Sequence, residues 1–279
     1  MKIGILVPAY NVSPVLGKVI RGIAESPHFA TVAEVLIIDN QSTDSTHAVA
    51  LAFSGEASPI GSKITVLRHH QNYGYGSSIK TGFQYFLDRP EVTHILVIHG
   101  DHQADPEAVL ETYVQAGQVT GVEAVVGSRF MAGADSSHYS LVRKLGNYFF
   151  NFLTWILTGQ KMSDAGAAVA LLSVARVRQI PFLRFSNSMQ FHPQFNIFLY
   201  RNCGETLLEV PVGWKDSEVP STVRVFSYGL ELLRLLFRYR VRVGLGTKDE
   251  EIFEPLPKVS NKSYDLFRGG KFIASKALS

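Results

Sequence analysis

Five short polar segments, each directly after an apolar run, carry side chains that could bind a nucleotide and a metal ion. They occupy residues 8–11, 39–44, 72–76, 99–103 and 127–130. Carboxylates can accept hydrogen bonds from a base N–H or a ribose hydroxyl, and glycines let the backbone approach a ligand closely. An Asp beside other oxygen or nitrogen ligands can hold a divalent cation against a pyrophosphate. Together the segments predict a site for a nucleotide and a metal ion.

The apolar runs before these segments are typical of buried strands. They cover residues 2–8, 34–39, 63–67, 94–98 and 124–127, and segments with helical spacing or capping residues separate them. Apolar strands that alternate with helices favour a mostly parallel sheet covered on both faces. Ligands bind such a sheet at the carboxyl ends of its strands, where the polar segments lie. The predicted fold class is therefore α/β, with the site at one edge of the sheet.

The second half of the chain has a different pattern. Residues 145–157 form a dense apolar and aromatic segment, and we expect its aromatic run, residues 148–155, in the core. Residues 207–212 are typical of a strand. Residues 223–243 combine five arginines with apolar residues at helical spacing, including Phe226, Leu230, Leu233 and Phe237. Such a helix could lie on an anionic membrane surface, and a packed helix or a dimer contact is an equal alternative.

These patterns predict a main domain over residues 1–222, a basic amphipathic helix over 223–243 and a polar tail over 244–279. The 279 residues are 46% hydrophobic and 18% charged, which is enough apolar material for a large core. A net charge of +3 is too small to indicate a nucleic-acid partner. The single Cys203 excludes an internal disulfide. No run reaches the ~18 apolar residues of a membrane-spanning helix, and the first apolar run is too short for a signal peptide, so we expect a cytoplasmic protein.

The motifs together resemble a known family. The series VPAYN, IIDNQSTDST, NYGYGSSIKTGF, HGDHQADPE and VGSRF, in this order and spacing, is similar to glycosyltransferase family 2 with the GT-A fold. Within that family the layout resembles the dolichol-phosphate mannose synthase-like branch, whose D-x-D-x-Q-x-x-P-E motif stands at HGDHQADPE. The resemblance covers roughly residues 3 to 215 and extends weakly into LLEVPVGW.

The resemblance implies a role for each matching residue. Six residues would bind the nucleotide: Pro8, Tyr10, Asn11, Asp39, Asn72 and Gly74. Asp101 matches the second Asp of the metal motif and Gln103 a Gln that assists it, so the implied cofactor is Mn²⁺ or Mg²⁺. Arg129 and Arg143 match two arginines that hold an acceptor phosphate. The implied activity is inverting transfer of a sugar from a nucleoside diphosphate sugar to a polyprenyl phosphate or a nascent cell-envelope glycan.

Three departures from the family pattern bear on this activity. His99 replaces the first Asp of the metal motif, and an imidazole can ligate Mn²⁺ but suits Mg²⁺ less well than a carboxylate. Asn40 and Gln41 stand where the family has an Asp and a glycine. The family's later D-x-x-S-G-x-R stretch reads DAGAAVA over residues 164–170, without its Ser, second-block glycine and Arg.

The sequence has arginines for an acceptor but no evident catalytic base downstream. A hydroxyl nucleophile needs a positioned base, whereas a phosphate monoester is largely anionic at neutral pH and needs only to be oriented. This favours a lipid-phosphate acceptor, although Asp164 could act as a base. A peripheral membrane contact would bring the site to such an acceptor.

Two other functions fit part of the pattern. His99, Gln41 and the alanine-rich residues 164–170 could mark a non-catalytic protein that binds a nucleotide sugar or glycan. His99, Asp101 and His102 fill three of the four positions of an H-x-H-x-D-H zinc motif, which is typical of a metallohydrolase. Val97 occupies the first position of that motif, and an apolar side chain cannot ligate a metal.

Overall fold

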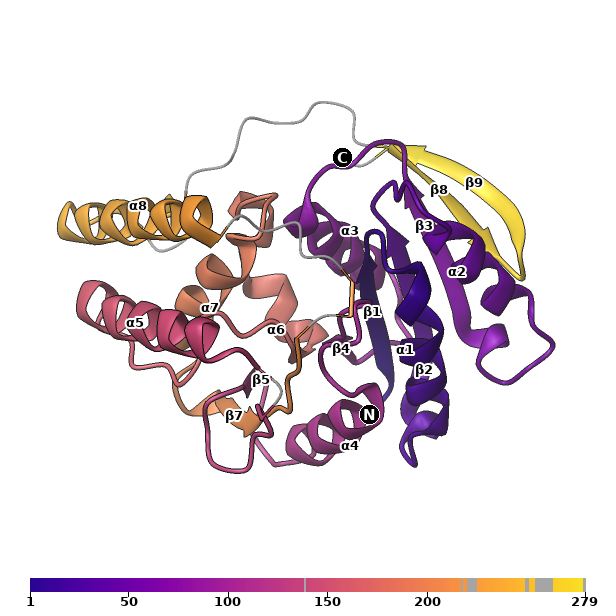
Figure 1. The fold of residues 1–279 in the computed structure, drawn as a ribbon, viewed down its shortest axis with the longest axis horizontal. Coiled ribbons are helices and arrows are strands. Elements are labelled where there is room, and N and C mark those ends of the chain that lie inside the picture. The colour runs from indigo at the N-terminus through magenta and orange to yellow at the C-terminus, as the bar shows by residue number, and fades with distance from the viewer. Residues whose placement is uncertain (138, 217, 220–224, 249–250, 254–262, 278–279) are drawn as a thin grey trace.

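A computed structural model describes residues 1–137, 139–216, 218–219, 225–248, 251–253 and 263–277 (Figure 1). Within these residues one nine-stranded sheet has the order β7-β5-β6-β4-β1-β2-β3-β8-β9. The strands are β1 Ile3–Ala9, β2 Val32–Asp39, β3 Ile64–His69, β4 His94–Val97, β5 Ala124–Ser128, β6 Ala170–Ser173, β7 Leu207–Pro211, β8 Ser263–Arg268 and β9 Lys271–Ala277. Strands β4, β1, β2 and β3 are mutually parallel, while β6 lies antiparallel between β4 and β5.

Helices cover both faces of the sheet, as predicted. They are α1 Ser13–Glu25, α2 Thr46–Gly55, α3 Tyr75–Leu87, α4 Pro106–Gly117, α5 Leu141–Thr158, α6 Val174–Gln179, α7 Phe191–Asn202 and α8 Val225–Gly244. Successive strand residues point to opposite faces. On β2, Ile37 therefore packs in the core under α1, α2 and α4, whereas Leu36 and Ile38 pack in the core under α3 and α7. The predicted α/β class is confirmed, with a mixed sheet.

The C-terminal residues join the sheet instead of forming a polar tail. Strands β8 and β9 form an antiparallel hairpin. Strand β8 pairs antiparallel with β3, and Asp265 lies opposite Arg68. Gly269 and Gly270 form the turn with φ of 58° and 70°, the backbone that a two-residue hairpin loop requires. The prediction was wrong for residues 263–277 because Tyr264 and Leu266 alternate with polar residues and complete the core beside β3. Residues 249–250, 254–262 and 278–279 of the predicted tail lie outside the described residues.

Most of the aromatic run of α5 is not in the core. Tyr148, Phe149 and Trp155 are exposed, while Asn147 and Asn151 face inward and make hydrogen bonds. Phe150 is the one aromatic side chain of the run that is buried in the core, beside these asparagines and Thr154. The prediction failed for the rest of the run because the polar side chains share the inward face, so the main apolar stripe points away from the protein.

The predicted basic helix is present as α8 and packs beside α5 (Figure 1). Leu232, Leu235, Leu236 and Tyr239 bury one face of α8 in the core. Residues 223–224 of the predicted helix lie outside the described residues, as does the side chain of Phe226. In the part of the chain that is described, we find no helix with the length and apolar character needed to cross a membrane.

Candidate active site

The polar segments that follow β1, β2, β3 and β4 lie together. Asn40 N donates to Ala9 O at 3.0 Å, and Gly100 N donates to Pro8 O at 3.1 Å. The Asn40 side chain reaches the segment after β3, because its Nδ2 donates to Asn72 Oδ1 at 2.8 Å. Parallel pairing of β4, β1, β2 and β3 places these ends at one edge. The predicted convergence of these four segments at one edge is therefore present, while their role as a ligand site stays a prediction.

Asn11 fixes the loop after β2. Its backbone has φ of 53°, and its Oδ1 accepts a hydrogen bond from Thr43 N at 2.8 Å. Asn11 N donates to Ser42 Oγ at 3.0 Å, and Ser42 N donates to Asp39 Oδ1 at 2.8 Å. An asparagine tolerates the left-handed backbone better than most residues. These bonds join the first two polar segments into one wall of the site.

Asp39 is fully buried, and only one of its two carboxylate oxygens accepts a hydrogen bond from a described residue. Its Oδ2 lies 3.2 Å from Arg68 Nε and 3.6 Å from His47 Nδ1, yet it accepts no aligned hydrogen bond among the described residues. Burial lowers the pKa of His47, and the Arg68 charge lowers it further. A buried oxygen of this kind needs an explanation. A donor from a bound nucleotide would provide one, so the nucleotide role of Asp39 stays a prediction with a physical motive.

Gly74 has a structural reason to be a glycine. Its φ is 89°, and an added Cβ would lie 2.4 Å from Asn187 O. Gly76 is similarly close to Ser186 O. The start of α3 therefore packs directly on the loop at residues 186–188, which Lys80 also binds through Asn187 Oδ1 at 2.8 Å. Contact of Gly74 with a nucleotide stays a prediction.

His99 belongs to a buried group that the sequence did not indicate. Tyr75 Oη lies 2.7 Å from His99 Nε2 and 2.5 Å from His192 Nε2, and the two imidazole rings stack with centroids 5.7 Å apart. The other His99 nitrogen faces the Ala168 carbonyl. Tyr75 lies in the same motif as Gly74, but His192 comes from α7 and no local pattern could have linked it to His99.

The protons of this group follow from its partners. Burial lowers the pKa of His99, lowers that of His192 well below its ordinary value, and raises that of Tyr75 well above its own, so all three are neutral near pH 7. A carbonyl only accepts, so His99 donates to Ala168 and accepts at Nε2 from Tyr75. His192 then donates its Nε2–H to Tyr75 Oη. Neither nitrogen of His99 is open to a metal ion in this arrangement, and a ligand role for His99 stays a prediction that requires release of Tyr75.

Gln103 links Asp101 to the chain that follows β7. Gln103 N donates to Asp101 Oδ1 at 3.3 Å, and Gln103 Nε2 donates to Lys215 O at 3.0 Å. Lys215 Nζ lies 3.1 Å from His102 Nδ1. Within the described part of the chain, no three His, Cys, Asp or Glu side chains converge as a metal group. Asp101, which is partly exposed, is the carboxylate available at this end of β4.

A single carboxylate still fits a metal that is shared with a substrate. Mg²⁺ commonly binds through one or two carboxylates together with substrate phosphates, without a cage made only of protein ligands. The chemistry of Asp101 and the adjacent Gln103 matches that mode of binding. In that mode the diphosphate would supply most of the metal ligands, so the protein would need few ligands of its own.

Arg129 is tightly held inside the protein. Its Nε and Nη2 donate to Asp164 Oδ2 and Oδ1 at 2.6 and 2.7 Å, and its guanidinium lies over the Trp214 ring. Burial alone would lower the pKa of Arg129, but the Asp164 carboxylate outweighs burial and raises it. Asp164 is itself buried and bound through both oxygens, so it is badly placed to act as a base.

Arg143 is held more loosely than Arg129. Its Nη1 donates to Asp216 Oδ1 at 2.8 Å, and both side chains are about two-fifths exposed, at 39% and 43%. Exposed pairs of this kind contribute little stability and exchange partners easily. Asn147 connects the two arginines, because its Oδ1 accepts from Arg129 Nη2 and its Nδ2 donates to Arg143 O. The roles of both arginines toward an acceptor stay predictions.

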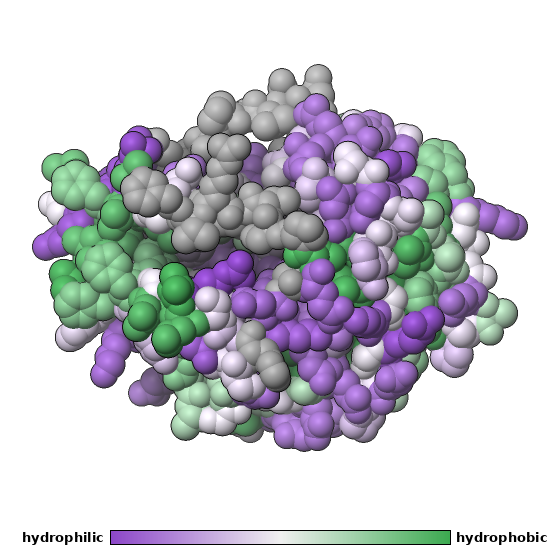
Figure 2. All heavy atoms as spheres, in the orientation of Figure 1, coloured by the Kyte–Doolittle hydropathy of each residue, from purple (hydrophilic) through white to green (hydrophobic). Residues whose placement is uncertain are grey.

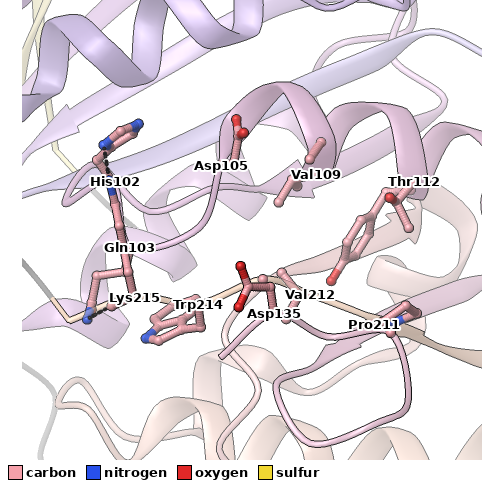
Figure 3. Close-up of a pocket in the computed structure, with 14 residues that line it drawn as sticks. His102, Gln103, Asp105, Val109, Thr112, Asp135, Pro211, Val212, Trp214 and Lys215 are labelled. Atoms are coloured by element: carbon pink, nitrogen blue, oxygen red, sulfur yellow. Dashed lines mark hydrogen bonds between the residues drawn. The ribbon is translucent and has the colours of Figure 1, made fainter. Parts of the chain in front are cut away.

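A cavity of about 550 Å³ adjoins the metal motif between α4 and the chain that follows β7 (Figure 3). His102, Gln103 and Lys215 lie at one end of the view and Thr112 and Pro211 at the other. Gln103 is the one predicted site residue among its lining residues. The cavity therefore lies beside the strand ends where the nucleotide is predicted.

Comparison with known proteins gives the class. The family model named glycosyl transferase family 2 matches residues 4–180, so the chain belongs to this family. The predicted family and enzyme class are confirmed, and the metallohydrolase alternative is wrong.

Three similar proteins are informative. The UDP-N-acetylglucosamine–dolichyl-phosphate N-acetylglucosaminyltransferase of Methanococcus voltae is 21% identical, over 73% of this chain and 78% of that protein. The dodecaprenyl-phosphate galacturonate synthase of Rhizobium johnstonii is 22% identical, over 88% of this chain and 70% of that protein. The glucosyl-3-phosphoglycerate synthase of Mycobacterium tuberculosis, in complex with Mn²⁺, UDP and glucosyl-3-phosphoglycerate, has a TM-score of 0.58 at 15% identity, over 88% of this chain and 81% of that chain. This last likeness confirms the fold.

Proposed function

We propose that this protein transfers a sugar from a nucleoside diphosphate sugar to a polyprenyl phosphate, with inversion at the sugar carbon. The single observation that carries the choice of acceptor is the state of Asp164, the carboxylate beside Arg129, which is buried and bound through both oxygens. An acceptor hydroxyl needs a base, whereas an acceptor phosphate does not. Two relatives that are named for lipid-phosphate substrates support the same choice.

The donor binds at the ends of β1, β2 and β3. Asp39 Oδ2 receives a hydrogen bond from the base or ribose, and Pro8, Tyr10, Asn11, Asn72 and Gly74 line the nucleotide pocket. Uridine diphosphate sugars are the first donors to test, because one relative is named for a UDP-sugar and one similar structure contains UDP. Asp101, assisted by Gln103, holds a divalent ion together with the diphosphate. When bound, that ion neutralises charge on the leaving diphosphate.

The acceptor phosphate binds on the side of α5. Arg143 exchanges its exposed partner Asp216 for the phosphate. Arg129, which Asp164 orients, adds positive charge at the inner face of α5. Because the phosphate arrives as an anion, the protein has to orient and partly desolvate it. A nascent cell-envelope glycan is the alternative acceptor, and a position at the cytoplasmic face of the membrane stays a prediction.

Thermal-shift measurements on the purified protein test the donor half of this proposal. A ligand that binds only the native state raises the apparent melting temperature. We expect an upward shift with UDP or a UDP-sugar that grows when Mn²⁺ is added. No shift with any nucleoside diphosphate, with or without Mn²⁺, would contradict donor binding. Mass spectrometry of a water-soluble short-chain polyprenyl phosphate after incubation with the donor tests the acceptor half.

A second function has one specific observation in its favour. Tyr75 occupies the Nε2 atom of His99, at the first position of the metal motif, as expected of a protein that binds a nucleotide sugar without catalysis. Donor binding without hydrolysis or transfer to any phosphate acceptor would favour this second function.

A further inference from the structure

Helix α5 has its apolar face turned away from the protein. Eight large apolar side chains along it are between 48% and 78% exposed: Leu141, Val142, Leu145, Tyr148, Phe149, Phe152, Trp155 and Ile156. Their spacing of three, four and seven residues forms one stripe. The opposite face holds Asn147, Phe150, Asn151 and Thr154; Phe150 is buried in the core, and both asparagines make hydrogen bonds to the protein. Apart from Tyr148, whose ring lies 4.8 Å from that of Phe130, this orientation leaves the apolar stripe largely exposed.

Helix α8 extends the same surface. It packs beside α5, and its outer side exposes Leu230, Leu233, Phe237 and Val241. Figure 2 shows hydrophobic side chains gathered on the side of the molecule where α5 and α8 lie in Figure 1. We call these twelve residues of α5 and α8 the apolar platform. Monomeric soluble proteins rarely expose a continuous patch of this kind unless it has a function.

Positive charges border the apolar platform. Arg234, Arg238 and Arg240 of α8 are exposed, and none of them makes an ion pair with a described residue. Arg234 and Arg238 lie one helical turn apart, next to Leu233 and Phe237. Aromatic and aliphatic side chains flanked by arginines are the composition of helices that lie in the interface of an anionic bilayer.

We propose that the apolar platform docks on an anionic lipid bilayer and presents the bilayer surface to the acceptor side of the active site. The inner face of α5 carries Asn147, which contacts Arg129 directly. A helix with its side chains is about 10–12 Å across, so a bilayer on its outer face lies about one helix diameter from Arg129. A lipid phosphate in that bilayer reaches Arg143, which lies on the same helix, without a membrane-spanning segment. This inference rests on the proposed lipid acceptor.

A bilayer fits the apolar platform better than a second copy of the chain. In a symmetric dimer the same patch of each copy contacts the other, so the arginines of both copies, Arg234 and Arg238 among them, would border one shared interface. Like charges placed together across an interface oppose association. An anionic bilayer would instead neutralise the charge of the arginines and bury the aromatic side chains at the same time.

Vesicle flotation with the full chain tests the proposal. We expect the protein to float with phosphatidylcholine vesicles that contain phosphatidylglycerol, and less with phosphatidylcholine alone. The variant F149S/F152S/W155S should lower the bound fraction about tenfold or more, because it lacks three large apolar side chains whose transfer from water into the bilayer favours binding. R234E/R238E should abolish the preference for anionic vesicles. The matched control F272S/I273S removes two side chains of β9 that are 58% and 52% exposed, and should float like the wild type.

Two further measurements separate the explanations. Light scattering after size exclusion measures self-association, and a dimer that only F149S/F152S/W155S abolishes, with no flotation of the wild type, would overturn the bilayer proposal. Equal flotation of that variant and the wild type would also overturn it. UDP binding, measured by thermal shift on every variant, keeps the two proposals apart. Donor binding without flotation overturns only the docking surface, whereas flotation without donor binding overturns only the transferase proposal.

Discussion

Arg129 and Asp164 form a buried bidentate ion pair, with Nε–Oδ2 and Nη2–Oδ1 distances of 2.6 and 2.7 Å. The pair joins the segment after β5 to the segment before β6, so it organises the proposed acceptor side of the site from two distant parts of the chain. The Arg129 guanidinium also lies over the ring of Trp214, and this ring makes a T-shaped contact with His99 at a centroid distance of 6.1 Å. A continuous series of side-chain contacts therefore runs from the proposed acceptor side, at Arg129, through Trp214 to the metal motif at His99.

Removal of the Asp164 charge should destabilise the protein strongly. In Asp164→Asn, the buried Arg129 charge loses its partner, and breaking a buried pair costs about 3–5 kcal/mol. Urea denaturation of the wild type and the variant measures the change in unfolding free energy. Asp216→Asn breaks the exposed pair with Arg143 and serves as the control, with an expected change of about 0–1 kcal/mol. Equal changes for both variants would refute the structural role of Asp164.

Loss of the Tyr75 hydroxyl should have two effects. In Tyr75→Phe, the buried His99 and His192 nitrogens lose their shared partner, which should cost about 1–3 kcal/mol of unfolding free energy. The same change frees His99 Nε2, so titration calorimetry should show tighter Mn²⁺ binding in the presence of UDP. Tyr148→Phe, an exposed change on α5, is the control. Mn²⁺ affinity that does not change in Tyr75→Phe would show that Tyr75 does not keep His99 from the metal.

Stability should fall as the pH falls below about 6.5. Burial lowers the pKa of His192 well below 6.5, and the neighbouring His99 lowers it further, while burial also lowers the pKa of His99. The unfolded imidazoles bind protons near pH 6.5 and the folded ones do not, so protons favour the unfolded state in this window. Urea denaturation at about pH 7.5 and about pH 5.5 measures the loss.

The variant His192→Gln should reduce this pH dependence, since one buried imidazole is gone. His28→Gln, in the loop between α1 and β2, should leave it unchanged. A pH dependence that is the same in His192→Gln and the wild type would assign the effect to other groups.

Asp101→Asn should abolish transfer and leave the fold intact. Asn keeps the Oδ1 atom that accepts from Gln103 N but loses the charge that binds a divalent ion. We expect turnover to fall about a hundredfold or more, in the range typical when a group that stabilises transition-state charge is removed. The thermal shift with UDP should lose its dependence on Mn²⁺, while the melting temperature without ligand should stay close to that of the wild type. Wild-type turnover in Asp101→Asn would show that the metal assignment is wrong.

The sequence alone was enough to predict the α/β sheet, its first five strands and the convergence of Asn11, Asp39, Asn72 and Asp101 at one edge. These features depend on local apolar runs and on the rule that parallel strands present their carboxyl ends together. The family followed from motifs in the same segments. The hairpin of β8 and β9 also had a local signal, the two glycines between alternating residues, but the composition of the segment resembled a tail.

Only the tertiary structure decided which partners the site residues have. His192 is 93 residues beyond His99 in the chain, and Asp164 is 35 residues beyond Arg129, so no local periodicity records either contact. The orientation of α5 was decided in the same way. Its sequence shows an apolar stripe, but which face turns inward depends on hydrogen bonds that Asn147 and Asn151 make to other segments. Local sequence determines the element and its pattern, whereas long-range contacts determine the direction in which that pattern faces.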